Sequence, residues 1–162
     1  MGFNEKVHAF IAAKFYVYLT EAFGERGERA FIHGTQYYAE QRGRRMAQRA
    51  MADELDLAVL PLHVHIGEET YANYLEYGEW VNTQEIIDEG CANKSTIESW
   101  APDYRIHITM CPWYTQFKEM GLPDAGHVYC AHLDNSICRG FNPYLTYLVP
   151  DTLHKSGFCT HI

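Results

Sequence analysis

Cysteines, histidines and carboxylates gather in the last third of the chain. The run 110–143 (MCPWYTQFKEMGLPDAGHVYCAHLDNSICRGFNP) holds three cysteines, two histidines and Asp134, and the closing LHKSGFCTHI adds one cysteine and two histidines. Groups of these types can bind a metal ion, attack an electrophilic substrate or, as thiols, fill a hydrophobic core. The spacing of these residues along the chain indicates which of the three roles each one suits.

The run 125–139 has the spacing of a helix that carries a polar stripe. Residues three and four positions apart share a helix face. This spacing predicts one stripe, made of His127, Cys130, Asp134 and Cys138. In one interpretation the stripe offers a thiol with an acid and an imidazole within reach. In the other, Cys130 and Cys138 face the core and the polar groups lie at its edge.

Cys111 lies where a predicted strand meets a predicted helix. In YRIHITM (104–110) apolar and polar residues alternate, as in a half-buried strand, and Pro112 suits the first turn of a helix. The open amides and the positive dipole end of a helix N-terminus stabilise a thiolate. We therefore predict that Cys111 is the best-placed nucleophilic thiol; the alternative is that it caps the core beneath the helix.

The cysteines and histidines lack the spacing of a structural zinc site. Such sites commonly pair ligands two to four residues apart on a turn, and the chain has no C-x-x-C. His63 and His65 in the HVH segment would share one face of a strand, but two histidines at this spacing are more typical of an exposed surface than of a metal site. Cys159 and His161 would share one face of a strand. A four-ligand zinc or iron site is geometrically conceivable from Cys111, Cys130, Cys159 and His161. We predict no metal ligand and no cofactor, with zinc or iron as the minor alternative.

Apolar periodicity predicts helices in the first third of the chain. The two predicted helices cover 4–23 and 25–54. The second contains Gly34 and Gly43, which lie on nearly opposite faces at about 100° per residue. Each glycine is therefore expected to admit a different neighbour closely, with a break near Gly34 as the alternative.

The remaining elements are strands mixed with two short helices. The predicted elements are a strand over 104–110, helices over 112–120 and 125–139, the latter closed by Gly140, and strands within LTYLVPDTL (145–153) and GFCTHI (157–162). Helices followed by strands are typical of an α+β fold. We predict N-terminal helices packed on an antiparallel sheet with two short C-terminal helices, in a single domain covering 1–162.

The overall composition is that of an ordinary globular protein and excludes some partners. A net charge of −8 opposes non-specific binding to nucleic acid, which needs a basic face. No run approaches the roughly 18 apolar residues of a membrane span. The N-terminal segment lacks the order of a secretory signal, so we expect a cytoplasmic protein. The chain has five cysteines, an odd number, and cytoplasmic proteins rarely form disulfides, so we expect no disulfide framework.

Two segments of the chain together resemble the L-2-amino-thiazoline-4-carboxylic acid hydrolase family. They are HGTQYYAEQRGRRMA (33–47) and the C-terminal run that begins with CPWYTQFKEMG at Cys111. The elements of the shared pattern are Arg42–Gly43, Cys111–Pro112, Gly121, Tyr129–Cys130, Asp134, the run from Gly140 to Pro143, and Gly157 with Cys159. No single motif is specific for this family, but the order and spacing of the motifs together are fairly specific for it.

This resemblance implies a hydrolase that opens a cyclic amidine ring. In the reaction for which the family is named, water adds to the ring carbon between nitrogen and sulfur and gives N-carbamoyl-L-cysteine. That carbon is electrophilic when the ring nitrogen is protonated. A carboxylate would stabilise this cation, and either a base activates water or a thiolate attacks. The partner implied is a small-molecule substrate with a carboxylate.

Residue chemistry and motif position together suggest roles for six residues. Asp134 would hold the amidinium or act as a base, and Cys111 or Cys130 would be the nucleophile. His132 is a weaker acid–base candidate because it points away from the face shared by Cys130 and Asp134. The predicted substrate-binding residues are Arg42, as a clamp for the carboxylate, and Asn142.

Two other functions remain compatible with the sequence. One is a small-ligand or metal-binding sensor module on the same scaffold, and the other is a hydrolase of the same fold that acts on a different small heterocycle. A homo-oligomer is also compatible with the sequence.

Overall fold

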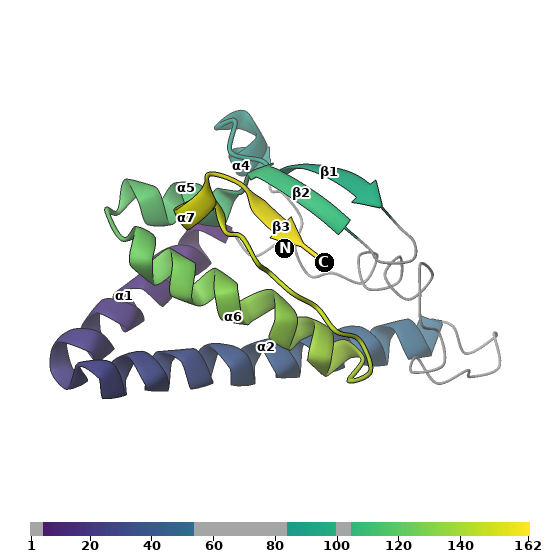
Figure 1. Ribbon diagram of the computed structural model, residues 1–162, viewed down its shortest axis with the longest axis horizontal. Coiled ribbons are helices and arrows are strands. Elements are labelled where there is room, and N and C mark those ends of the chain that lie inside the picture. Colours follow the sequence, from purple (N-terminus) through teal and green to yellow (C-terminus); the bar gives the residue numbers. More distant parts are fainter. Residues whose placement is uncertain (1–4, 54–83, 100–104) are drawn as a thin grey trace.

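The computed structural model describes residues 5–53, 84–99 and 105–162 of the chain. The helices are α1 (Glu5–Phe23), α2 (Glu25–Asp53), α4 (Gln84–Asp88), α5 (Pro112–Glu119), α6 (Pro123–Phe141) and α7 (Leu153–Ser156) (Figure 1). The strands are β1 (Lys94–Ser99), β2 (Arg105–Met110) and β3 (Cys159–His161). The HVH segment 63–65 lies outside the described residues. Within them, no helix is long and apolar enough to cross a membrane.

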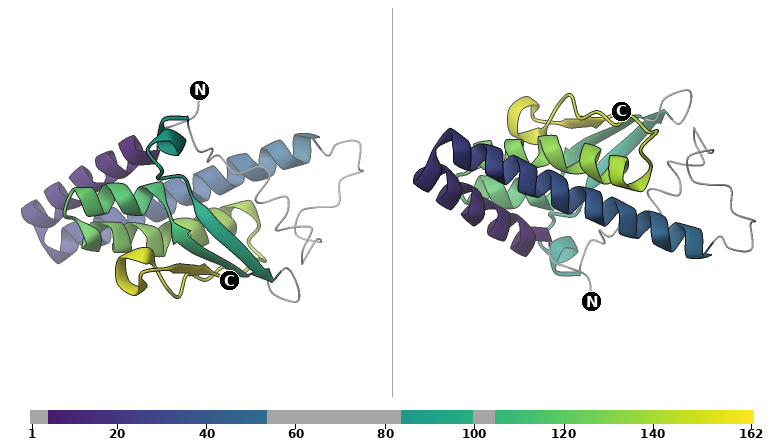
Figure 2. Two further views of the ribbon diagram at one scale, coloured as in Figure 1. Left: turned by 90° about the horizontal axis from the view of Figure 1, so that it is seen from above. Right: turned by 90° about the horizontal axis from the view of Figure 1, so that it is seen from below.

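The two N-terminal helices form a hairpin that packs on the C-terminal helices. Gly24 has a φ of 55°, a left-handed conformation that glycine adopts without strain, and it ends α1 as the chain reverses into α2. Helix α2 packs along α6, and α1 packs on α5. Helix α6 lies between α2 and β3 in the views of Figures 1 and 2. The predicted helices over 4–23 and 25–54 are confirmed to within a residue at each described end.

Two glycines bring α2 and α6 into backbone contact. A Cβ on Gly43 would overlap the carbonyl oxygen of Ile137, and a Cβ on Gly140 would overlap that of Glu40. The close neighbour predicted at Gly43 is therefore confirmed. The one predicted at Gly34 is wrong for the described residues, none of which lies within 4 Å of its Cβ position, and α2 continues through Gly34 unbroken.

The end of α6 also differs from the prediction. Gly140 does not close the helix, because α6 continues to Phe141. The residue was expected to be a helix stop, since glycine is common just beyond helix ends. Here it serves inter-helix packing instead, and Asn142 is the capping residue, with an extended backbone (φ −147°).

The sheet is antiparallel with the order β1-β2-β3, which agrees with the predicted α+β class. In β2 the predicted alternation holds, because Ile108 is buried while Arg105 and Thr109 are exposed. Strand β3 pairs with β2 so that Ile106 lies opposite His161 and Ile108 lies opposite Cys159. This register brings the C-terminal end of the chain beside the strand that leads into α5.

The predicted strand over 145–153 is wrong. Leu148 exchanges two backbone hydrogen bonds with Ile162, and Asp151 forms an isolated bridge with Thr160, but no regular strand forms. Pro150 lies between these contacts and has no N–H with which to continue a ladder. The chain turns at Thr152 into the short helix α7.

The buried apolar side chains of the described residues form two clusters. The larger lies among α1, α2, α5 and α6 and includes Phe117, Tyr129 and Ile137. The smaller consists of Ile108, Leu153 and Cys159, between the sheet and α7. Partly buried Cys111 packs against both clusters, so the junction of β2 and α5 lies where they meet.

Candidate active site

A cavity of about 180 Å³ lies where the two apolar clusters meet. Its walls come from α1, α5, α6, α7, β2 and β3. Its chemistry-bearing lining residues include Glu5, Cys111, Cys130, Asp134, Cys159 and His161. Three of them, Cys111, Cys130 and Asp134, are candidates from the sequence. The turn after β2 and the part of the α6 stripe that carries Cys130 and Asp134 therefore line the same space.

The predicted stripe on α6 divides between two environments. Cys130 and Asp134 line the cavity, whereas Cys138 is fully buried in the larger apolar cluster. The Nδ1 atom of His127 lies 2.9 Å from the hydroxyl of Thr152, which is itself part of the cavity wall. The core interpretation thus holds for Cys138, while Cys130 and Asp134, but not His127, are among the described residues that line the cavity.

The other three residues suggested by the sequence lie outside this lining. His132 is on α6 but is not part of the cavity wall. Arg42 is almost completely buried in α2, where its charge acts on His8 and Tyr129. Asn142 accepts a hydrogen bond of 3.0 Å from the backbone N–H of Tyr144 and so shapes the turn after α6.

Burial opposes a thiolate at each cysteine of the cavity, including Cys111, whose thiolate the helix N-terminus was expected to stabilise. Burial raises the pKa of Cys111 to about 11, although the backbone amides of Tyr114 and Trp113 at the start of α5 lower it. Burial likewise raises the pKa of Cys159 to about 12 and that of Cys130 well above its ordinary value. The helix N-terminus is present as predicted, but desolvation of the sulfur outweighs it. A thiol in this cavity therefore needs a base beside it.

Such a base lies beside Cys159. The Sγ atom of Cys159 and the Nε2 atom of His161 are 3.1 Å apart, because residues two apart on β3 point to the same side. The other ring nitrogen, Nδ1, lies 2.7 Å from the hydroxyl of Tyr147. The carboxylate of Asp134 reaches in from α6, with Oδ2 3.8 Å from Nε2. A thiol, an imidazole and a carboxylate thus converge on one wall of the cavity.

The hydrogen bond to Tyr147 bears on which nitrogen of His161 carries the proton. In the tautomer in which Nδ1–H donates to the Tyr147 oxygen, the lone pair of Nε2 faces the Cys159 thiol and can take its proton. Burial lowers the pKa of His161, while the charge of Asp134 raises it by less. The imidazole is therefore neutral at pH 7, which is the form that acts as a base.

The family profile for L-2-amino-thiazoline-4-carboxylic acid hydrolase matches residues 4–159 of the 162. The chain belongs to this family. No curated protein and no solved structure matches it. The match includes the first turn of α1, the long helix α2 and the cavity-lining residues through Cys159, so the site described above lies almost entirely within the matched region.

Sequence analysis missed several residues that this family member brings to its cavity. His161 was expected only as a possible metal ligand, and Cys159 only as a possible metal ligand and an element of the family pattern. Their two-residue spacing on a strand was the available signal for a thiol–imidazole pair. Tyr147 had no signal, because it was assigned to a regular strand. Glu5 and His154 also line the cavity, and nothing local in the sequence connects either residue to Asp134.

A metal-binding interpretation gains no geometric support from the described part of the chain. There, no three histidine, cysteine, aspartate or glutamate side chains are arranged to hold a metal ion. The conceivable set Cys111, Cys130, Cys159 and His161 is thus not assembled as ligands. The prediction that the protein uses no cofactor stays a prediction.

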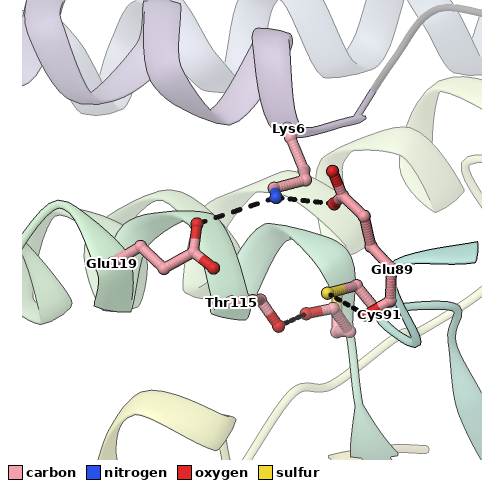
Figure 3. A network of polar contacts seen from close by, with 6 residues as sticks. Lys6, Glu89, Cys91, Thr115 and Glu119 are labelled. Carbon is pink, nitrogen blue, oxygen red and sulfur yellow. Dashed lines mark hydrogen bonds and ion pairs between the residues drawn. The ribbon is translucent and has the colours of Figure 1, made fainter. Parts of the chain in front are cut away.

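A network of polar contacts holds the first turn of α1 beside the cavity. The Nζ atom of Lys6 lies 2.7 Å from Oε2 of Glu89 and 3.7 Å from Oε2 of Glu119 (Figure 3). These contacts tie α1 to α5 and to the turn after α4. In the same network Thr115 donates a hydrogen bond of 3.2 Å to the carbonyl oxygen of Cys111. The network therefore links the two elements that carry Glu5 and Cys111.

Proposed function

We propose that this protein is a hydrolase that opens a small cyclic amidine ring, in a reaction resembling the conversion of L-2-amino-thiazoline-4-carboxylate to N-carbamoyl-L-cysteine. The observation that carries the proposal is the convergence of Cys159, His161 and Asp134 on one cavity. A nucleophile within hydrogen-bond reach of a base is the arrangement of covalent catalysis, and Tyr147 at the Nδ1 atom of His161 is the further group that orients this base. Family membership supports the same reaction class.

The dimensions of the cavity suit this class of substrate. Drug-sized ligands need pockets of roughly 300–1,000 Å³, whereas this cavity measures about 180 Å³. A five-membered heterocycle with one or two substituents is correspondingly small. Most of the wall is apolar, with Ile108, Trp113 and Leu133 among its residues, so a bound ring is shielded from bulk water.

In the first half of the proposed reaction the ring opens. The Asp134 carboxylate holds the protonated amidine, whose positive charge makes the carbon between nitrogen and sulfur electrophilic. His161 takes the thiol proton of Cys159, and the sulfur bonds to that carbon. The ring C–S bond then breaks, and the departing sulfur receives the proton from His161. This leaving group needs little help, because an ordinary thiol pKa is only about 8.5.

In the second half the enzyme is released. His161 takes a proton from water as the water oxygen adds to the same carbon. The bond between this carbon and Cys159 breaks, and the proton returns to the Cys159 sulfur. One water molecule is consumed overall, and the proton that the amidine carried is released to solvent, so the product is a neutral urea that bears a free thiol. The geometry favours Cys159 over Cys111 and Cys130 as nucleophile, because Cys159 has the neutral imidazole beside it.

Asp134→Asn tests the proposal directly. We expect the variant to lower kcat/KM on L-2-amino-thiazoline-4-carboxylate by about 10²–10³-fold, the usual effect of removing one group that stabilises charge in a transition state. Turnover is followed by release of a free thiol and by the mass of the product. Asp124→Asn is the matched control, since Asp124 lies exposed in the first turn of the same helix.

Two results would contradict the proposal. One is full activity in a folded Asp134→Asn protein, as judged by its thermal melt. The other is a wild-type protein that turns over no cyclic amidine. Tight binding of such a compound without turnover would instead favour a small-ligand sensor module.

A further inference from the structure

Glu5 is a buried acidic residue, one carboxylate oxygen of which has no hydrogen-bond partner among the described residues. It lies in the first turn of α1 and is 2% exposed. Its Oε2 atom is inaccessible to solvent and has no hydrogen-bond partner among the described residues. The residue lines the same cavity as Asp134. A buried carboxylate oxygen without a partner is costly, so a ligand that donates to it gains a correspondingly strong interaction.

The described wall of the cavity contains no fixed positive charge to balance its carboxylates. None of the described residues that line it is a lysine or an arginine. The basic side chains there are His154 and His161, and burial lowers the pKa of both, that of His154 to about 4. Lys6, next to Glu5 in the chain, is bonded to Glu89 and Glu119 instead (Figure 3). The cavity therefore presents the carboxyl groups of Glu5, whose pKa burial raises, and of Asp134, together with neutral bases.

We propose that Glu5 is a specificity-determining residue that, together with Asp134, makes this cavity select a planar organic cation with N–H groups on two nitrogens, such as an amidinium. This inference rests on the proposed function and names the charge state of its substrate. Each carboxylate accepts a hydrogen bond from the ligand, and the positive charge lies between elements from the two ends of the chain. An uncharged ring of the same shape leaves both carboxylates unpaired and binds weakly.

Two small probes separate charge from shape. 2-Amino-2-thiazoline is a cation at pH 7.5, whereas 2-methyl-2-thiazoline has nearly the same shape, is much less basic and is neutral at that pH. Isothermal titration of the full chain with each probe measures the difference. We expect wild-type protein to bind the amino compound at least about tenfold more tightly, the least that one charge-assisted hydrogen bond contributes.

The variant Glu5→Gln tests whether Glu5 causes the preference for the cationic probe. The variant should weaken binding of 2-amino-2-thiazoline by about tenfold or more and leave the affinity for 2-methyl-2-thiazoline within about twofold. Glu21→Gln, an exposed position on the same helix, should change neither affinity.

The inference is overturned if wild-type protein binds both probes equally or binds neither, or if Glu5→Gln binds the cation as tightly as wild type. If Glu5→Gln does not fold, the wild-type comparison of the two probes decides. A protein that binds the cation through Glu5 but does not hydrolyse it would refute the proposed reaction alone. An active hydrolase whose cation affinity is unchanged by Glu5→Gln would refute this inference alone.

Discussion

Cys159→Ala is expected to lower kcat on a cyclic amidine substrate by about three orders of magnitude, because it removes the nucleophile of the proposed reaction. The Cys159 thiol is buried and its pKa is raised to about 12, so it reacts only when His161, 3.1 Å away, takes its proton. His161→Gln should therefore cause a loss of similar size. Steady-state kinetics measure both effects. Rapid quenching followed by mass spectrometry should show a covalent adduct in wild type that is absent from Cys159→Ala.

Alanine substitutions of the other cysteines are the controls for Cys159→Ala. Cys91 lies outside the cavity lining, in the turn after α4, where its thiol contacts the carbonyl oxygen of Glu89 at 3.6 Å. Cys91→Ala should retain wild-type turnover. If Cys159→Ala remains within about tenfold of wild type while Cys111→Ala or Cys130→Ala is inactive, the nucleophile is misassigned, since general-base and nucleophile losses normally exceed that value.

The pH dependence of activity follows from His161. Burial lowers its pKa below the ordinary 6.5, so the imidazole is neutral at pH 7 and able to act as a base. Activity is expected to persist through neutral pH and to fall only as the pH drops below 6.5 toward the lowered pKa. The same group destabilises the folded state in acid, because protonation is easier in the unfolded chain. A kcat/KM profile that falls with an apparent pKa above 6.5 would contradict this assignment.

Gly43→Ala is expected to destabilise the protein by about 3 kcal/mol, the upper range for forcing extra atoms into a packed interface. The new methyl group would overlap the carbonyl oxygen of Ile137 in α6. That atom belongs to the helix backbone, so it cannot move aside as a flexible side chain would. Separating α2 from α6 would also loosen the larger apolar cluster that supports the cavity. Urea unfolding followed by far-ultraviolet circular dichroism measures the loss.

Gly34→Ala is the matched control on the same helix. In the part of the chain that the structure describes, nothing lies within 4 Å of the Cβ position of Gly34. The substitution should therefore increase the free energy of unfolding by up to about 1 kcal/mol, the difference in helix propensity. If Gly43→Ala is as stable as wild type, the close approach of α2 and α6 at this point is incorrect.

Local spacing determined much of this fold and part of the site. The periodicity of the first fifty residues fixed α1 and α2, and the alternation of YRIHITM with Pro112 after it placed Cys111 between β2 and α5. The i, i+4 relation of Cys130 and Asp134 put both on one face of α6, and both face the cavity. Each of these features depends on residues close in sequence. Their side chains return to the same face every two positions in a strand and every 3.6 positions in a helix. The motif order likewise resembled the family whose profile matches the chain.

The protonation states and partners in the site were decided by the tertiary structure alone. Cys111 lies at a helix N-terminus as expected, but its pKa depends on how many distant residues exclude water from its sulfur. His161 meets Asp134 because β3 pairs with β2 beside α6, and Glu5 reaches the same cavity from the other end of the chain. A single sequence shows periodicity but not which distant segments touch, and these contacts set the burial, charge and hydrogen bonding on which the chemistry depends.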